Sequence, residues 1–230
     1  MYSKPQKMVA EFVGTFALIF FGAGSICADQ LLRATNPGGL GLLGIAVAHG
    51  LAIGIMVSAV GHISGGHLNP AVTIGFWVTR KTSTFEALLY WVAQLAGAAA
   101  AAYLLRWIVP DDAWHAVALG TPDLARDFTR TSGMILEGVM TFFLVFVFFA
   151  TAADEHGAFG KIAGFAIGLT VTMDILMGGP LTGAAMNPAR TFGPALAAQH
   201  WANHGVYWVG PLSGGVVAGW LYDSLYLKKV

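Results

Sequence analysis

Apolar residues along the chain gather in long stretches and do not alternate with polar ones. A helix that crosses a membrane needs about 20 mostly apolar residues, and several stretches reach that length. The pattern therefore predicts an all-α membrane protein with transmembrane helices at six places: 8–28, 40–62, 85–109, 132–153, 161–178 and 205–227.

Two shorter segments, 63–84 and 179–204, lie between these spans, and each contains Asn-Pro-Ala. Their apolar runs are too short to cross a bilayer, and loop backbone cannot face lipid because its unpaired amides are costly there. Both segments are therefore predicted to be re-entrant. Asn is a preferred N-cap and Pro suits the first helical position, so each motif predicts the start of a half-helix: Asn69-Pro70-Ala71 and Asn187-Pro188-Ala189.

The two halves of the chain resemble each other in three blocks that occur in the same order. AEFVGTF (10–16) matches LEGVMTF (136–142), HLNPAVT (67–73) matches AMNPART (185–191), and YWVAQLAG (90–97) matches YWVGPLSG (207–214). Each half has three spans, so the second half is predicted to lie inverted relative to the first, with the functional site near the midplane. We expect one domain over 1–230, with repeats at about 1–109 and 132–230.

Composition narrows the class of protein further. Of the 230 residues, 56% are hydrophobic and 10% are charged, whereas soluble domains have about 25% charged residues. The mean hydropathy of +0.67 agrees with a membrane protein. The net charge of +0 gives no reason to expect a nucleic-acid partner, and the single cysteine, Cys27, excludes a disulfide framework. The spans carry no nucleophile–base pair and no metal cluster, so neither an enzyme nor a cofactor is expected.

Cationic residues predict the orientation through the positive-inside rule. The first span follows Lys4 and Lys7 directly, and we expect it to be a retained helix, not a cleaved leader. Both termini are predicted to be cytoplasmic, and the short termini and loops favour a bacterial inner (plasma) membrane. The cytoplasmic side would carry Lys4, Lys7, Arg80, Lys81, Lys161, Lys228 and Lys229, and the other side Arg33, Arg106, Arg126 and Arg130.

Two half-helices that enter from opposite faces would bring their N-termini together at mid-membrane. The amides of Asn69 and Asn187 could then offer N–H donors to a passing solute, and the helix dipoles would place partial positive charge there. Such a site admits water and small neutral solutes and disfavours cations, protons included.

The chain resembles the aquaporin (major intrinsic protein) family over nearly its whole length. The resemblance rests on both Asn-Pro-Ala motifs, SGGH (64–67), Arg190 after the second motif, and the repeated Glu11 and Glu137. It implies a right-handed bundle of six helices plus two half-helices, one pore per subunit and a homotetramer.

The resemblance also implies roles for particular residues. Glu11 and Glu137 would brace the re-entrant loops through hydrogen bonds, and His67 would pack against its loop and line the cytoplasmic half of the pore. Arg190 would form the outer constriction. Spacing from the motifs adds three more filter positions, and the quartet resembles that of plant tonoplast intrinsic proteins: His49, Ile175, Ala184 and Arg190.

A filter of this kind implies a passive channel for water that also conducts ammonia. A glycerol facilitator is the alternative: Ala184 and Ile175 leave room for glycerol, whereas Thr191 and Tyr207-Trp208 stand where glycerol facilitators usually carry Asp and Pro-Leu. An ion-coupled secondary transporter is a further alternative, but it would need acids at the midplane, and Asp174 is the one candidate.

Four residues have less certain roles in the sequence. Asp174 precedes Ile175, and adjacent helical residues point about 100° apart, so it could contact a neighbouring helix, a loop, another subunit or the filter's surroundings. His115 lies in the long loop 110–131, where some tonoplast proteins carry a histidine that reaches the filter. His200 and His204 have a metal-like spacing, but ordinary surface histidines are the simpler interpretation.

Overall fold

The computed structural model describes residues 2–154 and 162–227, and all the regular secondary structure in these ranges is helical. Lys161, Lys228 and Lys229, three of the cations used for the orientation, lie outside the described residues. The two halves have the same plan of three long helices and one half-helix. The first half contains α1 (Lys4–Ala17), α3 (Gly41–Ser64), α4 (Pro70–Val78) and α5 (Thr84–Ile108), and the second α7 (Arg130–Phe148), α8 (Ala163–Thr182), α9 (Pro188–Ala198) and α10 (Val206–Tyr222).

Short helical turns complete the long helices. The first span is continuous from α1 through a π-helical turn, η1 (Leu18–Ala23), into α2 (Gly24–Arg33). Two further π-helical turns, η3 (Phe149–Ala153) and η5 (Asp223–Leu227), extend α7 and α10. A short helix α6 (Asp111–Ala116) and a turn η2 (Ala118–Gly120) lie in the long loop.

The predicted spans agree with the structure in number and position, with two differences at their ends. Five helices in the described part are long and apolar enough to cross a membrane by themselves, and α10 with η5 covers the sixth predicted span. The first span continues to Arg33, because Asp29 is buried in an ion pair with Arg33 and accepts hydrogen bonds from the backbone N–H groups of Leu40 and Gly41. The fifth span continues through Pro180 and ends where Gly183 has φ 78°.

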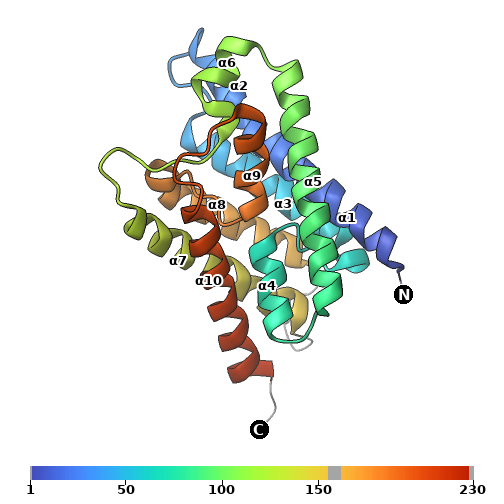
Figure 1. Cartoon of the computed structure of the whole chain (residues 1–230). Helices are drawn as coiled ribbons and strands as arrows, with labels where there is room; N and C mark the ends of the chain where they lie inside the picture. The colour runs from blue at the N-terminus through green and yellow to red at the C-terminus, as the bar shows by residue number, and fades with distance from the viewer. Residues whose placement is uncertain (1, 155–161, 228–230) are drawn as a thin grey trace.

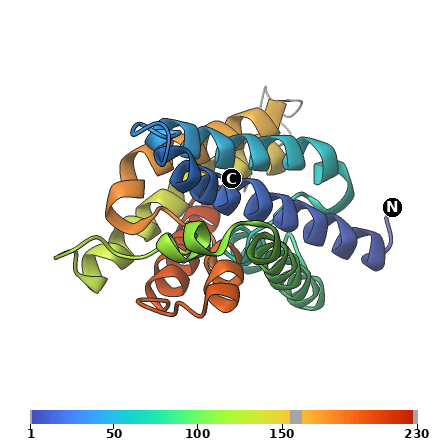
Figure 2. The same ribbon diagram turned by 90° about the horizontal axis from the view of Figure 1, so that it is seen from above.

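The long helices surround the two half-helices. In Figure 1, α9 lies above α4, the start of α1 and the end of α10 lie in the lower half, and α6 lies at the top. Figure 2, seen from above, shows α1 and α3 side by side. The most extensive helix pairs are α3 with α8 and α7 with α10, which are equivalent in the two halves. At the α3–α8 contact, a Cβ on Gly54 would lie 2.9 Å from the carbonyl oxygen of Gly164, so this approach requires glycine.

Candidate permeation site

The two Asn-Pro-Ala motifs start the two half-helices. The Asn69 side chain accepts a hydrogen bond from Ala71 N (2.7 Å), and the Asn187 side chain accepts one from Ala189 N (2.9 Å) and one from Arg190 N (3.3 Å). Each asparagine is thus an N-cap with extended backbone, followed by proline at the first helical position. This part of the prediction, which depends on local preferences, agrees with the structure.

The half-helices meet through reciprocal hydrogen bonds that the sequence does not reveal. Asn69 Nδ2 donates to the carbonyl oxygen of Met186 (2.9 Å), and Asn187 Nδ2 donates to that of Leu68 (2.9 Å). An amide group carries two N–H donors, so this pairing uses one of them on each side. The pairing fixes both side chains in the middle of the molecule, and the second N–H of each remains to donate to a solute.

The loop before each motif follows the same backbone path in both halves. Gly65, Gly66 and Leu68 have φ of 92°, 62° and 51°, and the equivalent residues Gly183, Ala184 and Met186 have φ of 78°, 45° and 52°. Left-handed backbone is costly for residues other than glycine. Three non-glycine residues therefore hold a strained conformation: Leu68, Ala184 and Met186.

Two buried glutamates bind these strained loops. Glu11 accepts hydrogen bonds from Ser64 Oγ (2.6 Å), His67 N (2.9 Å) and Leu68 N (2.6 Å), and also from Gln94 Nε2 (2.8 Å). Every partner is a donor, as expected for an ionised carboxylate.

Glu137 repeats the arrangement in the second half with one partner fewer. It accepts hydrogen bonds from Thr182 Oγ1 (2.7 Å), Ala185 N (2.9 Å) and Met186 N (2.7 Å). Pro211 stands in the repeat where the first half has Gln94. The contacts of both glutamates are of the kind that the resemblance implied.

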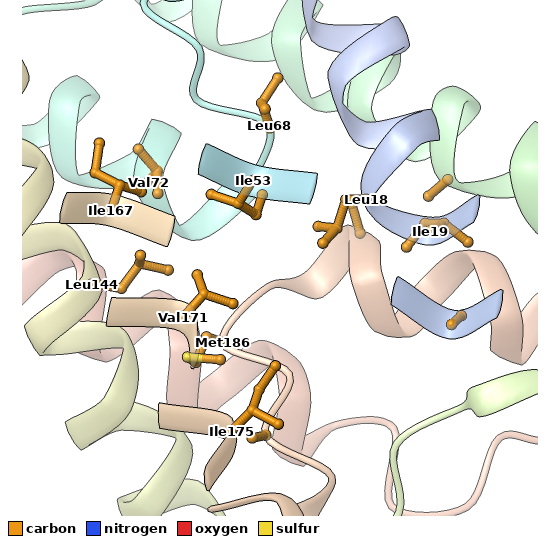
Figure 3. Close-up of a cluster of buried hydrophobic side chains, with 14 of the residues drawn as sticks. Leu18, Ile19, Ile53, Leu68, Val72, Leu144, Ile167, Val171, Ile175 and Met186 are labelled. Carbon is orange, nitrogen blue, oxygen red and sulfur yellow. The ribbon is translucent and has the colours of Figure 1, made fainter. Parts of the chain in front are cut away.

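A narrow cavity, with about 20 Å³ open to the centres of water-sized molecules, runs along the ends of the half-helices. Its walls are mostly apolar, and Figure 3 shows side chains from several elements around this part of the core. The polar lining consists of five side chains, which include candidates from both halves: His49, His67, Asn69, Asn187 and Arg190. The apolar lining includes Leu18, Ile53, Val72, Leu144, Val171, Ile175, Ala184 and Met186.

The four filter candidates lie on this cavity, and two of them are in contact. Arg190 Nη2 lies 3.2 Å from His49 Nε2, and His49 Nδ1 lies 2.9 Å from the carbonyl oxygen of Ile45. These contacts assign the proton to Nδ1, so that Nε2 accepts from the guanidinium. Arg190 Nη1 donates to the carbonyl oxygen of Gly120 (2.7 Å), whereas its buried Nε has no partner among the described residues.

His67 lines both this cavity and a second hollow, which has about 280 Å³ open to the centres of water-sized molecules. Its Nδ1 is 3.1 Å from Thr73 Oγ1, and its ring packs on Phe76 with the centroids 4.6 Å apart. The second hollow is also lined by Lys7 and Glu86, which form an ion pair of 2.6 Å. His67 therefore links the cavity to a hollow that has charged residues on its wall.

Comparison with known proteins decides the family. The family model described as major intrinsic protein matches residues 2–222. The chain belongs to the aquaporin (major intrinsic protein) family. "Aquaporin TIP2-2" of Zea mays is 47% identical over 226 residues, which cover 96% of this chain and 88% of that protein. "Probable aquaporin TIP3-2" of Arabidopsis thaliana is 44% identical over 234 residues, covering 98% and 85%.

A solved structure supports the same fold. It is described as the X-ray structure of the aquaglyceroporin from Plasmodium falciparum, with a TM-score of 0.83, 25% sequence identity and 97% of each chain covered. The predicted architecture is therefore confirmed, and so is the resemblance to plant tonoplast intrinsic proteins. As an aquaporin-family member, the chain is a multi-pass membrane protein and a passive channel for water or small solutes, not an enzyme.

The remaining sequence candidates lie away from the cavity of this aquaporin. Asp174 is buried, does not line the cavity, and its Oδ2 has no hydrogen-bond partner in the described part of the chain. The His115 ring stacks on Trp114 with the centroids 3.6 Å apart. His200 Nε2 lies 2.8 Å from Asp123 Oδ2, and His204 Nε2 accepts from Trp208 Nε1 (3.0 Å).

Two residues beside His49 and Arg190 were missed in the sequence. Gly120 contributes a backbone carbonyl, for which no side-chain signal exists. Gly22, in the π-helical turn η1, lies against His49: a Cβ there would be 2.6 Å from His49 Cδ2 and 2.8 Å from Nε2. π-Helical turns occur often at functional sites, but the run of apolar residues around Gly22 gives no sign of one.

Proposed function

We propose that this aquaporin conducts water and ammonia and excludes protons and other ions. The observation that carries the proposal is a mostly apolar cavity with Asn69 and Asn187 at its middle and the pair of Arg190 and His49 on its wall. A few fixed donors along an apolar wall orient a small polar solute. The same wall has too few polar groups to replace the hydration shell of an ion, so ions are excluded.

Cation exclusion follows from charge at two levels of the cavity. Arg190 presents a guanidinium to the lumen, and both half-helices direct their positive dipole ends toward the cavity. The two Asn side chains offer donors to a passing water molecule, which must then accept from both and cannot continue a proton-conducting chain.

Ammonia permeation rests on the composition of the filter. Ile175 and Ala184 give its wall no hydrogen-bonding side chains, and the acceptor lone pair of His49 is engaged by Arg190. The wall therefore has few polar groups with which a solute less polar than water must form hydrogen bonds in order to pass. Neutral ammonia, which is close to water in size, fits these conditions.

The test is stopped-flow measurement on proteoliposomes of wild type, His49→Phe and the control Leu51→Phe, whose site is exposed on the same helix. We expect wild type and control to speed both osmotic shrinkage and internal alkalinisation under an inward ammonia gradient. His49→Phe should keep the water signal and lose most of the ammonia signal, because it removes the acceptor of Arg190 Nη2 and leaves a free guanidinium donor on the wall. Faster water transport without faster alkalinisation in wild type would refute the ammonia proposal.

Glycerol is the second candidate solute. It is favoured by the small Ala184 side chain on the cavity and by the likeness to a structure titled as an aquaglyceroporin. Thr191 and Tyr207-Trp208 argue against it, as they did in the sequence. Glycerol-driven swelling of the same vesicles discriminates the two, and we expect it to be no faster than in protein-free vesicles.

We also propose that the chain is a single domain of two inverted repeats, 1–109 and 132–230, that assembles as a homotetramer, as the family resemblance implies. Both termini in the cytoplasm and a bacterial inner membrane stay predictions, and the relatives, which come from plants, give the bacterial location no support. The mass of the detergent-solubilised complex tests the tetramer, and protease access to each terminus in oriented vesicles tests the topology.

A further inference from the structure

A strap, residues 120–125, leads from the turn η2 across the second half of the molecule. At its start, the Gly120 carbonyl oxygen accepts a hydrogen bond from Arg190 Nη1 (2.7 Å). At its end, Ala125 N donates to the carbonyl oxygen of Leu181 (2.9 Å). Between them, Pro122 lies so close to Gly183 that a Cβ on the glycine would be 3.0 Å from Pro122 Cα. The strap therefore spans from the filter arginine to the second re-entrant loop.

One side chain of the strap anchors it to the segment after α9. Asp123 Oδ2 lies 2.8 Å from His200 Nε2, and Asp123 Oδ1 accepts from Asn203 Nδ2 (2.8 Å). Asn203 in turn accepts from Arg130 Nε (2.9 Å) at the start of α7. This Asp123 cluster holds the strap three residues from the carbonyl that contacts Arg190.

The backbone next to the filter depends on such an anchor. Ala118, Leu119 and Gly120 have φ of 44°, 55° and 72° in succession. This left-handed backbone is costly for Ala118 and Leu119, which carry a Cβ. If the strap moves, Arg190 Nη1 loses its acceptor, and a buried guanidinium N–H must find another partner. The lumen is the open direction, so release of the strap would turn the guanidinium inward and narrow the cavity.

We propose that Asp123 and His200 are positioning residues for Arg190, acting through the strap, and that protonation of His200 tightens this anchor. The proposal rests on the proposed channel function. Histidine is the side chain whose charge changes between about pH 5 and 8. A charge-assisted hydrogen bond is roughly twice as strong as a neutral one, so acidification of the outer side favours the anchored strap.

Among the groups of the Asp123 cluster, His200 is the one that we propose responds to pH. Partial burial raises the pKa of Asp123, but hydrogen bonds from Asn203, His200 and Leu124 N outweigh it and hold the pKa below its usual value, so Asp123 stays charged at pH 5. Burial lowers the pKa of His204, whose Nε2 already accepts from Trp208.

Other charged or titratable groups stand on the elements packed around the pair. Arg130 on α7 acts through Asn203, and Tyr207 on α10 donates to the carbonyl oxygen of Thr182 (2.7 Å). Arg126 and Asp127 follow in the same loop and have no hydrogen bond or ion pair to the pair among the contacts of the described residues.

The experiment measures osmotic water permeability of proteoliposomes at pH 5.5 and 7.5, with the same buffer on both sides so that insertion orientation has no effect. The variants are His200→Gln, which can keep a neutral hydrogen bond, Asp123→Asn, and the control Asp127→Asn. One hydrogen bond corresponds to a factor of roughly 2 to 12 in an equilibrium constant. We expect wild type and Asp127→Asn to be faster at pH 5.5 by about threefold, and His200→Gln and Asp123→Asn to lose this difference.

Two further readouts separate positioning from general stability. The ratio of ammonia to water permeability at pH 7.5 should change in Asp123→Asn. Hydrogen exchange of 117–125, corrected for its intrinsic pH dependence, should be slower at pH 5.5 in wild type and Asp127→Asn, and not in the other two variants. Wild type that conducts water equally at both pH values would overturn the inference and leave the channel function intact. Wild type that conducts no water would instead overturn the proposed function.

Discussion

Replacement of Glu137 by glutamine tests the bracing of the second re-entrant loop. The carboxylate accepts three hydrogen bonds, two of them from the backbone N–H groups of Ala185 and Met186. A glutamine amide has one oxygen and one NH₂ group, so in either orientation one of these N–H donors faces another donor. A buried donor without a partner costs about 1–3 kcal/mol, and the loss of charge assistance adds to this. We expect a total destabilisation of about 2–4 kcal/mol.

The assay is thermal unfolding in detergent, followed by osmotic shrinkage of vesicles with the variant that still folds. In a chain of this size, 1 kcal/mol shifts Tm by about 2–4 °C, so Glu137→Gln should melt roughly 4–16 °C below wild type. Glu86→Gln is the control, because Glu86 is a partly exposed partner of Lys7 and such pairs contribute about 0–1 kcal/mol. A Glu137→Gln variant that melts with wild type would refute the view that the carboxylate holds the loop as an acceptor.

Three other substitutions follow from the same contacts. Ala184→Gly should raise stability by about 1 kcal/mol, because it removes a Cβ at φ 45°, and an unchanged or lower Tm would contradict the strain. Gly22→Ala should push the His49 ring from Arg190 and change the ratio of ammonia to water permeability about 2- to 12-fold; an unchanged ratio in vesicles would show that the ring tolerates the methyl group. Asp174→Asn should leave water permeability unchanged and Tm equal or higher, because the buried Oδ2 has no partner among the described residues; a clear loss of Tm would mean that this carboxyl is paired.

The half-helices could be predicted from the sequence because their starting signals are local. Asparagine is a preferred N-cap and proline suits the first helical position, and the repeat of the whole Asn-Pro-Ala motif separates these two starts from Asn36-Pro37, which lies in a turn. The reciprocal bonds between Asn69 and Met186 and between Asn187 and Leu68 could not be predicted in the same way. They depend on how two segments about 118 residues apart approach each other, and their acceptors are backbone atoms.

The filter shows the same difference between what could and what could not be predicted from the sequence. Arg190 was assigned by the family resemblance, and His49, Ile175 and Ala184 were carried over from it by their spacing from the motifs; the structure brings all four to one cavity. The carbonyl of Gly120 escaped notice because any residue has one, and its position depends on the left-handed turn before it. The end of the first helix was placed too early, at residue 28: the pairing of Asp29 with Arg33 and with the start of α3 lets the helix continue.

The central claim is that solutes move passively through the cavity between the half-helices. It is tested most directly by the initial rate of vesicle shrinkage measured against the size of the osmotic gradient, with and without a proton or sodium gradient across the membrane. A passive channel predicts a rate proportional to the osmotic gradient and unaffected by either ion gradient. A rate that saturates, or that requires a proton or sodium gradient, would contradict the account and favour an ion-coupled transporter.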